Sequence, residues 1–347
     1  MYLSILATIV GSLLPVAGTQ PDRQPAIASA PGLTAVVFGS GDSIWVSTSK
    51  DGGKHFSAPH EVAQSPALAL GRHRGPRVAI SGSTLVVTAV TGATPGDASK
   101  GDLVAWRSRD GGQSWKGPVV VNDVPGSARE GLHAFAATPN GTIAAVWLDV
   151  RGPEKTVMGA YSKDSGRSWS PNVLLYEKPG GTVCQCCAPS ISFGHNGRAS
   201  VMFRNIVGEA RDLYLLHWEP GNPPSEAQKV GTGSWILNAC PMDGGGLAQR
   251  GDEIATAWRR GKTVYLTDAG NNEVAIGEGK DVTAAMGSRG AYAAWTGANG
   301  IELHEPGQKT PRSLSPSGSF PAMATLANGS VLVAWEENGR IETKTVQ

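Results

Sequence analysis

Seven short apolar runs recur along the chain, and this repetition constrains the fold more than any other feature of the sequence. The runs are TAVVF (34–38), TLVVTAV (84–90), TIAAVW (142–147), ASVMF (199–203), EIATAW (253–258), AYAAW (291–295) and SVLVAW (330–335). They are spaced by roughly 37 to 57 residues, which brackets the period of four-stranded propeller blades. Helical repeats of this period would need long amphipathic stretches, which the sequence lacks.

Each run has a further strand candidate on either side of it. GPRVAIS (75–81), TLVVTAV (84–90) and DLVAWRSR (102–109) form one such meander, separated by turns rich in Gly, Asn and Asp. The 46 glycines and 23 prolines are scattered, as suits many short strands. The pattern predicts an all-β propeller of four-stranded antiparallel blades over residues 19–347 as a single domain. Six or seven blades are compatible with it and seven are favoured, with the N-terminal segment supplying the outer strand that the last repeat lacks.

Residues 1–18 form an apolar stretch that is too short to span a bilayer, and Val16 and Gly18 are small residues before a cleavage point. We interpret the stretch as a signal peptide, although its start has no Lys or Arg, which leaves a single-helix anchor or a misassigned start codon open. Either way the remainder is exported, to the periplasm or outside the cell. No other segment is apolar for long enough to span a membrane.

Charge excludes one class of partner. The chain has 30 basic and 29 acidic residues, so it lacks the basic surface that nucleic-acid binding needs. We expect a monomer that recognises its ligand locally.

Three segments share the pattern S-x-D-x-G-x-[S/T/H]-[W/F]: SKDGGKHF (49–56), SRDGGQSW (108–115) and SKDSGRSW (162–169). In each, the aspartate can accept hydrogen bonds from the backbone of a hairpin, while the glycine permits a positive φ. We therefore assign Asp51, Asp110 and Asp164 to structural turns and not to catalysis.

These Asp boxes make the chain resemble the sialidase-like (BNR repeat) superfamily, over almost everything after residue 25. The resemblance implies the propeller fold more securely than an activity, because the superfamily includes receptors and non-catalytic binding proteins. In true sialidases three arginines hold the substrate carboxylate, a tyrosine activated by a glutamate is the nucleophile, and an aspartate is the acid/base.

The resemblance suggests candidates for each of these roles. Arg77, Arg204 and Arg289 are the candidate carboxylate-binding triad, although the family's Arg-Ile-Pro signature is missing. The candidate nucleophiles are Tyr292 and Tyr265, with Glu130 or Glu209 as the base. Asp149 is the candidate acid/base, and an ion pair with Arg151 is an equally good explanation of the WLDVR sequence.

All four cysteines lie in two segments, CQCC (Cys184, Cys186 and Cys187) and ACPMDGG (Cys240). An even number of cysteines in an exported protein predicts disulfides, for example one that joins Cys240 to the first cluster. Alternatively, the thiolates form a soft-metal site for copper or zinc with Met242 and His133. The spacing matches no standard zinc motif. Both hypotheses stay open, as does a mixed arrangement with one disulfide and two metal ligands.

Further polar residues are expected around the same channel mouth, namely Glu130, Arg204, Asn205, Glu209, Arg211, Asp212 and Asp243. A pocket of such mixed charge suits a sugar or an anionic ligand as well as a metal. The leading hypothesis is a propeller that binds a glycan or small anionic ligand and needs no cofactor for its fold. Whether it also hydrolyses a glycan, as a glycoside hydrolase, stays open. The alternatives are a periplasmic soft-metal protein of the copper type and a non-catalytic interaction propeller.

Overall fold

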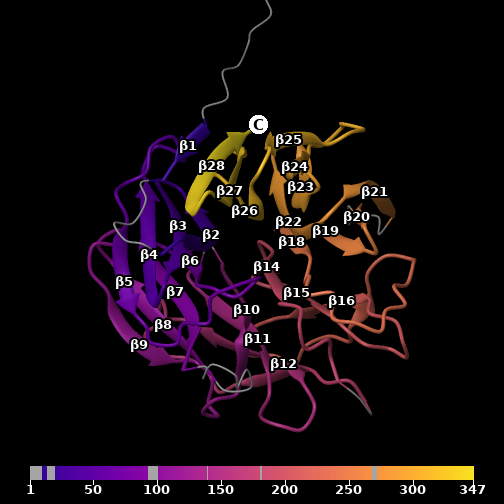
Figure 1. Ribbon diagram of the computed structural model, residues 1–347. Helices are drawn as coiled ribbons and strands as arrows, with labels where there is room; N and C mark the ends of the chain where they lie inside the picture. Colours follow the sequence, from indigo (N-terminus) through magenta and orange to yellow (C-terminus); the bar gives the residue numbers. More distant parts are fainter. Residues whose placement is uncertain (1–9, 14–19, 93–100, 139, 180–181, 268–271) are drawn as a thin grey trace, which may run out of the picture.

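The structure is a computed structural model, and it describes residues 10–13, 20–92, 101–138, 140–179, 182–267 and 272–347. Within these residues every regular element is a β-strand, and the strands form seven four-stranded antiparallel sheets. Figure 1 shows the sheets arranged around a central axis. The protein is therefore a seven-bladed β-propeller, which confirms the predicted architecture and the favoured number of blades. None of the described residues form a helix long and apolar enough to cross a membrane.

Blades 1 to 4 follow one another along the chain, and the first strand of each lies innermost. Blade 1 contains β2 (Asp22–Ala30), β3 (Leu33–Ser40), β4 (Ser43–Ser49) and β5 (His60–Gln64). Blade 2 contains β6 (Arg77–Ser81), β7 (Thr84–Thr91), β8 (Asp102–Ser108) and β9 (Lys116–Val120). Blade 3 contains β10 (Ala128–Ala137), β11 (Ile143–Asp149), β12 (Thr156–Ser162) and β13 (Val173–Tyr176). Blade 4 contains β14 (Ser190–Phe193), β15 (Ala199–Arg204), β16 (Leu213–Trp218) and β17 (Gln228–Lys229).

The remaining blades complete the ring. Blade 5 contains β18 (Gly246–Arg250), β19 (Glu253–Arg260), β20 (Thr263–Thr267) and β21 (Glu273–Glu278). Blade 6 contains β22 (Lys280–Gly287), β23 (Gly290–Gly297), β24 (Gly300–His304) and β25 (Arg312–Ser315). Blade 7 contains β26 (Ser319–Thr325), β27 (Val331–Glu337), β28 (Arg340–Val346) and, as its outer strand, β1 (Val10–Ser12).

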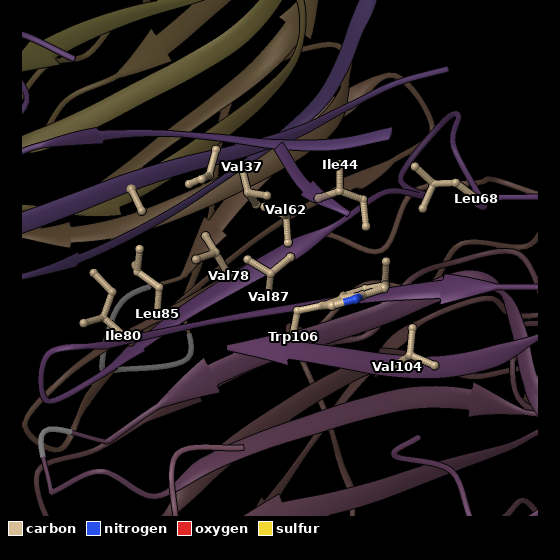
Figure 2. Close-up of a cluster of buried hydrophobic side chains, with 13 residues drawn as sticks. Val37, Ile44, Val62, Leu68, Val78, Ile80, Leu85, Val87, Val104 and Trp106 are labelled. Carbon is tan, nitrogen blue, oxygen red and sulfur yellow. The ribbon is translucent and has the colours of Figure 1, made fainter. Parts of the chain in front are cut away.

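The seven apolar runs of the sequence are the second strands of the seven blades. These strands are apolar on both faces because each blade is covered by a neighbour on either side; in β7, every residue except the last is buried. Figure 2 shows one interface of this kind, where Val37 and Ile44 of blade 1 pack against Val87 and Trp106 of blade 2. Each buried side chain of this size stabilises the fold by about 1.5 to 3 kcal/mol, so contacts between blades hold the ring together.

The ring is closed by the N-terminal segment. Strand β1 pairs antiparallel with β28, with Gly11 opposite Thr343, and the two strands lie side by side in Figure 1. The outer strand missing from the last repeat is thus supplied as predicted. Of the predicted signal peptide, residues 1–9 and 14–18 lie outside the described residues, and cleavage after Gly18 would remove β1.

The three Asp boxes form the same turn between the third and fourth strands of blades 1, 2 and 3. In the first, the Ser49 hydroxyl donates to Asp51 Oδ1 at 2.8 Å and accepts from the Gly53 N–H at 2.9 Å. Asp110 and Asp164 accept the equivalent bonds at 2.7 and 2.8 Å. Their predicted structural role is confirmed.

Candidate functional site

A cavity of about 250 Å³ occupies the centre of the ring. Its walls come from the innermost strand of every blade, so all seven blades contribute to it. The titratable side chains that line it are His73, Arg77, His133 and Asp281. A hollow of about 450 Å³ also lies between blades 4 and 5, but its lining comes from those two blades alone. The central cavity is therefore the place where residues far apart in the sequence converge.

The innermost strands enter this cavity through repeated β-bulges. The register shifts at the start of β2, β10, β22 and β26. At these shifts Gln24, Glu130, Asp281 and Phe320 have φ values of 55°, 47°, 59° and 52°. Left-handed backbone is costly for residues other than glycine, and such strain gathers at binding sites and active sites. The bulges thus turn the first residues of four blades toward the channel mouth. No pattern in the sequence predicted these bulges.

Arg77 is a cation that backbone carbonyls hold in place. Its Nη1 donates to Pro76 O at 3.0 Å and its Nη2 to His73 O at 2.9 Å, so backbone carbonyls fix the guanidinium. Among the described residues no carboxylate lies within ion-pair distance of it. Burial alone lowers the pKa of Arg77 to about 10. Arg77 lines the central cavity, where the sequence had placed it. Its positive charge is not compensated there by any carboxylate of the described residues.

His133 lies beside Arg77 but is fully buried. Its Nδ1 donates to Gly131 O at 3.1 Å, which leaves Nε2 to accept from the Thr88 hydroxyl at 3.1 Å. Burial, followed by the positive charge of Arg77, lowers the pKa of His133 to about 3. The ring is therefore neutral, and with both nitrogens hydrogen-bonded it is not the metal ligand that the sequence suggested.

A histidine–aspartate pair crosses the channel mouth. His73, in the loop before blade 2, lies 3.0 Å through Nε2 from Asp281 Oδ1 of blade 6, and its ring packs edge-on against Phe320 of blade 7 at 5.9 Å. Burial raises the pKa of Asp281, but the hydrogen bond and charge of His73 outweigh it, so the pKa is lowered. Sequence analysis missed this pair because the partners are 208 residues apart and meet only in the closed ring.

The predicted arginine triad does not assemble. Arg204 is 1% exposed, with Nε and Nη2 donating to Asp243 O at 3.1 and 2.9 Å and Nη1 donating to Arg211 O at 2.7 Å. Arg289 is exposed in the turn between β22 and β23, where it donates to the Gln347 and Pro306 carbonyls. That turn follows an innermost strand and so lies at the opposite end of the blade from Arg77. The triad hypothesis is wrong because Arg204 is structural and Arg289 is on the other face.

The candidate nucleophile and acid/base are also elsewhere. Tyr292 is 1% exposed and packs in the core between blades 6 and 7, where burial raises its pKa. Asp149 is fully buried and accepts from Arg151 Nε and Trp147 Nε1, both at 2.8 Å. The alternative of an ion pair with Arg151 is correct, and neither residue lines the central cavity.

The other predicted binding residues are held in local ion pairs and hydrogen bonds. Glu130 pairs with Arg74 and with Arg129. Asp212 pairs with Lys229 at 3.1 Å. Each of these carboxylates thus has a cationic partner, and none of them lines the central cavity.

Asp243 connects several elements around the mouth. Its Oδ2 lies 3.2 Å from Arg259 Nε and accepts the Asp281 N–H at 3.0 Å. Arg211 Nε donates to Leu237 O at 2.8 Å, and its Nη1 contacts Cys184 Sγ at 3.6 Å.

Three of the four cysteines form a compact cluster at the entrance to blade 4. The Sγ atoms of Cys184, Cys186 and Cys187 are separated by 3.7, 3.8 and 3.9 Å, whereas Cys240 is exposed and outside the cluster. No disulfide joins any of the four, all of which are described. The predicted bridge to Cys240 is therefore not present. The three CQCC thiols lie together, but Cys240 and His133 do not join them.

Thiol–thiol hydrogen bonds make the pKa values of the three cysteines unequal. Bonds from the Cys186 and Cys187 thiols, with the nearby charge of Arg204, lower the pKa of Cys184. The bond to Cys184 raises the pKa of Cys186, and burial raises that of Cys187. Within the cluster the thiolate form is therefore favoured at Cys184 over the other two cysteines.

A scan against protein-family models finds no match, and neither does a search of the curated proteins. Solved structures do match. An ulvan lyase with a bound GlcA-containing saccharide is 11% identical with a TM-score of 0.61, covering 98% of this chain and 96% of its own. The α-L-arabinanase of Penicillium chrysogenum, with bound arabinobiose, is 14% identical with a TM-score of 0.55, covering 98% and 97%. A Hadza microbial sialidase is 15% identical with a TM-score of 0.55, covering 92% and 74%. The chain therefore shares the β-propeller fold of sialidases, an arabinanase and an ulvan lyase.

Proposed function

We propose that the protein binds a small carboxylated sugar in its central cavity, with Arg77 as the group that holds the carboxylate. The observation that carries the proposal is the partly buried guanidinium of Arg77, which backbone carbonyls orient and which no carboxylate of the described residues neutralises. An arginine matches a carboxylate through two parallel hydrogen bonds. The cavity volume of about 250 Å³ limits the ligand to a small saccharide or a single residue of a glycan.

The rest of the lining supports a sugar. Phe320 and Phe135 provide apolar surface, while His73, Asp281 and Gln24 provide hydrogen-bonding groups. Binding pockets for small molecules typically combine apolar walls with a few placed polar groups. The structural neighbours include proteins solved with saccharides bound, which agrees with a carbohydrate ligand.

The proposal is for binding and not for sialidase-type hydrolysis. The candidate nucleophile Tyr292 is in the core, and the candidate acid/base Asp149 is occupied by Arg151 and Trp147. What the cavity offers is a fixed cation beside neutral and acidic hydrogen-bonding groups.

Isothermal titration with N-acetylneuraminic acid and with glucuronic acid tests this proposal. We expect at least one of the acids to bind, and its methyl ester not to bind. Arg77→Met should lower the affinity by about 10- to 100-fold, which is the contribution expected of a charge-assisted pair of hydrogen bonds. Arg289→Met, which removes an exposed arginine on the opposite face, should bind like the parent. Equal affinity for acid and ester would contradict the proposal.

We also propose that the protein is exported, on the strength of the apolar segment at residues 1–18. The intact mass of the protein from the periplasmic or secreted fraction of an expressing bacterium tests this. A chain beginning at residue 19 supports cleavage, and the full chain found only in the cytoplasm refutes export. Cleaved protein would have three strands in blade 7, because β1 lies within the removed segment.

A further inference from the structure

The three-cysteine cluster lies beside the central cavity without being part of it. The chain turns at Gln185–Cys187 so that three thiols within four residues face one point. Cys184 and Cys187 are 0% and 1% exposed, and Cys186 is partly exposed. A disulfide requires two sulfurs at about 2.05 Å, and none of the three pairs approaches that distance.

The sulfur triangle has the dimensions of a metal site. An ion equidistant from three sulfurs that are 3.7–3.9 Å apart would lie about 2.2 Å from each, close to the metal–thiolate distance of about 2.3 Å known for zinc. Protein groups also surround two of the sulfurs. Cys184 receives Arg211 Nη1 at 3.6 Å and Cys187 receives the Asp243 N–H at 3.4 Å.

One backbone donor thus contacts the cluster. It is the Asp243 N–H, which follows Met242, a residue with a left-handed φ of 52°. Hydrogen bonds from outer groups to metal-bound thiolates are a regular part of metal sites. Met242, expected from the sequence to offer its thioether, immediately precedes this backbone donor.

The surrounding charge suits an anionic metal–thiolate complex. Arg204 is 1% exposed and its charge acts on Cys184 and Cys187, and Arg211 contacts Cys184 directly. A monovalent ion with three thiolates has a net charge of −2, which these two arginines balance. Structural zinc takes four ligands, whereas the group found among the described residues has three, all of them soft sulfur. Soft thiolates suit monovalent copper, zinc and iron–sulfur clusters, and a set of three thiolates favours copper over four-coordinate zinc.

We propose that Cys184, Cys186 and Cys187 bind one monovalent copper ion through their three thiolates. Binding releases the protons that the thiols carry. Cys240, exposed and outside the cluster, is not a ligand. This copper site is separate from the proposed carboxylate-binding site at Arg77, so the two proposals can be tested independently.

The test is anaerobic titration of the reduced full chain with Cu(I), in competition with a chromogenic Cu(I) chelator. We expect one equivalent per chain, three sulfur neighbours at about 2.2 Å by X-ray absorption, and protection of three thiols against alkylation with Cys240 still reactive. Cys186→Ser, at the partly exposed position, should weaken binding by about 100-fold or more. Cys240→Ser is the matched control and should bind like the parent.

Four outcomes would overturn the proposal. They are a stoichiometry well below one, tighter binding of Zn(II) than of Cu(I), unchanged affinity in Cys186→Ser, or lost affinity in Cys240→Ser. Cys184→Ser gives a second ligand variant at a buried position, and circular dichroism reports whether each variant is folded. Arg77→Met should keep its copper, so that failure of the sugar-binding proposal leaves this result unaffected.

Discussion

Arg204→Leu is expected to lower the free energy of unfolding by about 3 to 5 kcal/mol, the range for removing one partner from a buried charged network. The guanidinium donates to the carbonyls of Asp243 and Arg211 at 2.7 to 3.1 Å, and its Cζ lies 5.3 Å from the centre of the Trp235 ring. Leucine would leave two buried carbonyls without donors, at about 1 to 3 kcal/mol each. Urea denaturation measures the change.

Arg289→Leu is the control for this prediction, because it also replaces an arginine by a leucine, but in an exposed turn. It should shift the free energy of unfolding by no more than about 0.5 kcal/mol. Arg204→Lys keeps the charge but not the planar fork, so we expect it to fall between the two. A loss below about 1 kcal/mol in Arg204→Leu would show that the buried hydrogen bonds of Arg204 contribute little to stability.

The second large effect is a dependence of stability on pH that comes from His133. Its pKa is lowered to about 3 in the folded protein, from an ordinary value of 6.5. Below pH 6.5 the unfolded chain binds a proton that the folded chain does not, so stability is full above that pH and declines toward pH 3. The limiting loss is about 5 kcal/mol, and about 2 to 3 kcal/mol of it falls between pH 6.5 and 4.5.

Chemical denaturation of the parent and of His133→Gln at both pH values isolates this contribution. Burial also lowers the pKa values of His217 and His304, but their effects persist in the variant and cancel in the difference. His195→Gln, at an exposed turn, is the control and should keep the full dependence of the parent. A pH dependence that is the same with and without His133 would disprove its neutral buried state.

The fold could be predicted because its signal is local and repeated. Each second strand is covered by neighbouring blades on both faces, so runs such as TLVVTAV (84–90) are apolar throughout and stand out at regular intervals. Each Asp box likewise makes its hydrogen bonds within a few residues of Asp51, Asp110 or Asp164. Such features do not depend on which blades meet across the ring.

The candidate site was predicted less well because it depends on long-range geometry. His73 and Asp281 meet across the mouth from blades 2 and 6, and nothing near either residue indicates the other. The sequence itself contradicts the predicted pairing of Arg289 with Arg77. Successive strands of a meander alternate in direction, so Arg77 before a first strand and Arg289 after one must lie at opposite ends of their blades.

Closure of the ring between blades 1 and 7 also orders the events of synthesis. The ribosome makes β2 early and β26 to β28 last, so the seam between these blades cannot form until almost the whole chain has emerged. Until then the unpaired edges of the nascent meander are open to the wrong strands, and pairings of such high sequence separation form slowly. A chaperone that shields those edges during translation would therefore act on the first blade for longest.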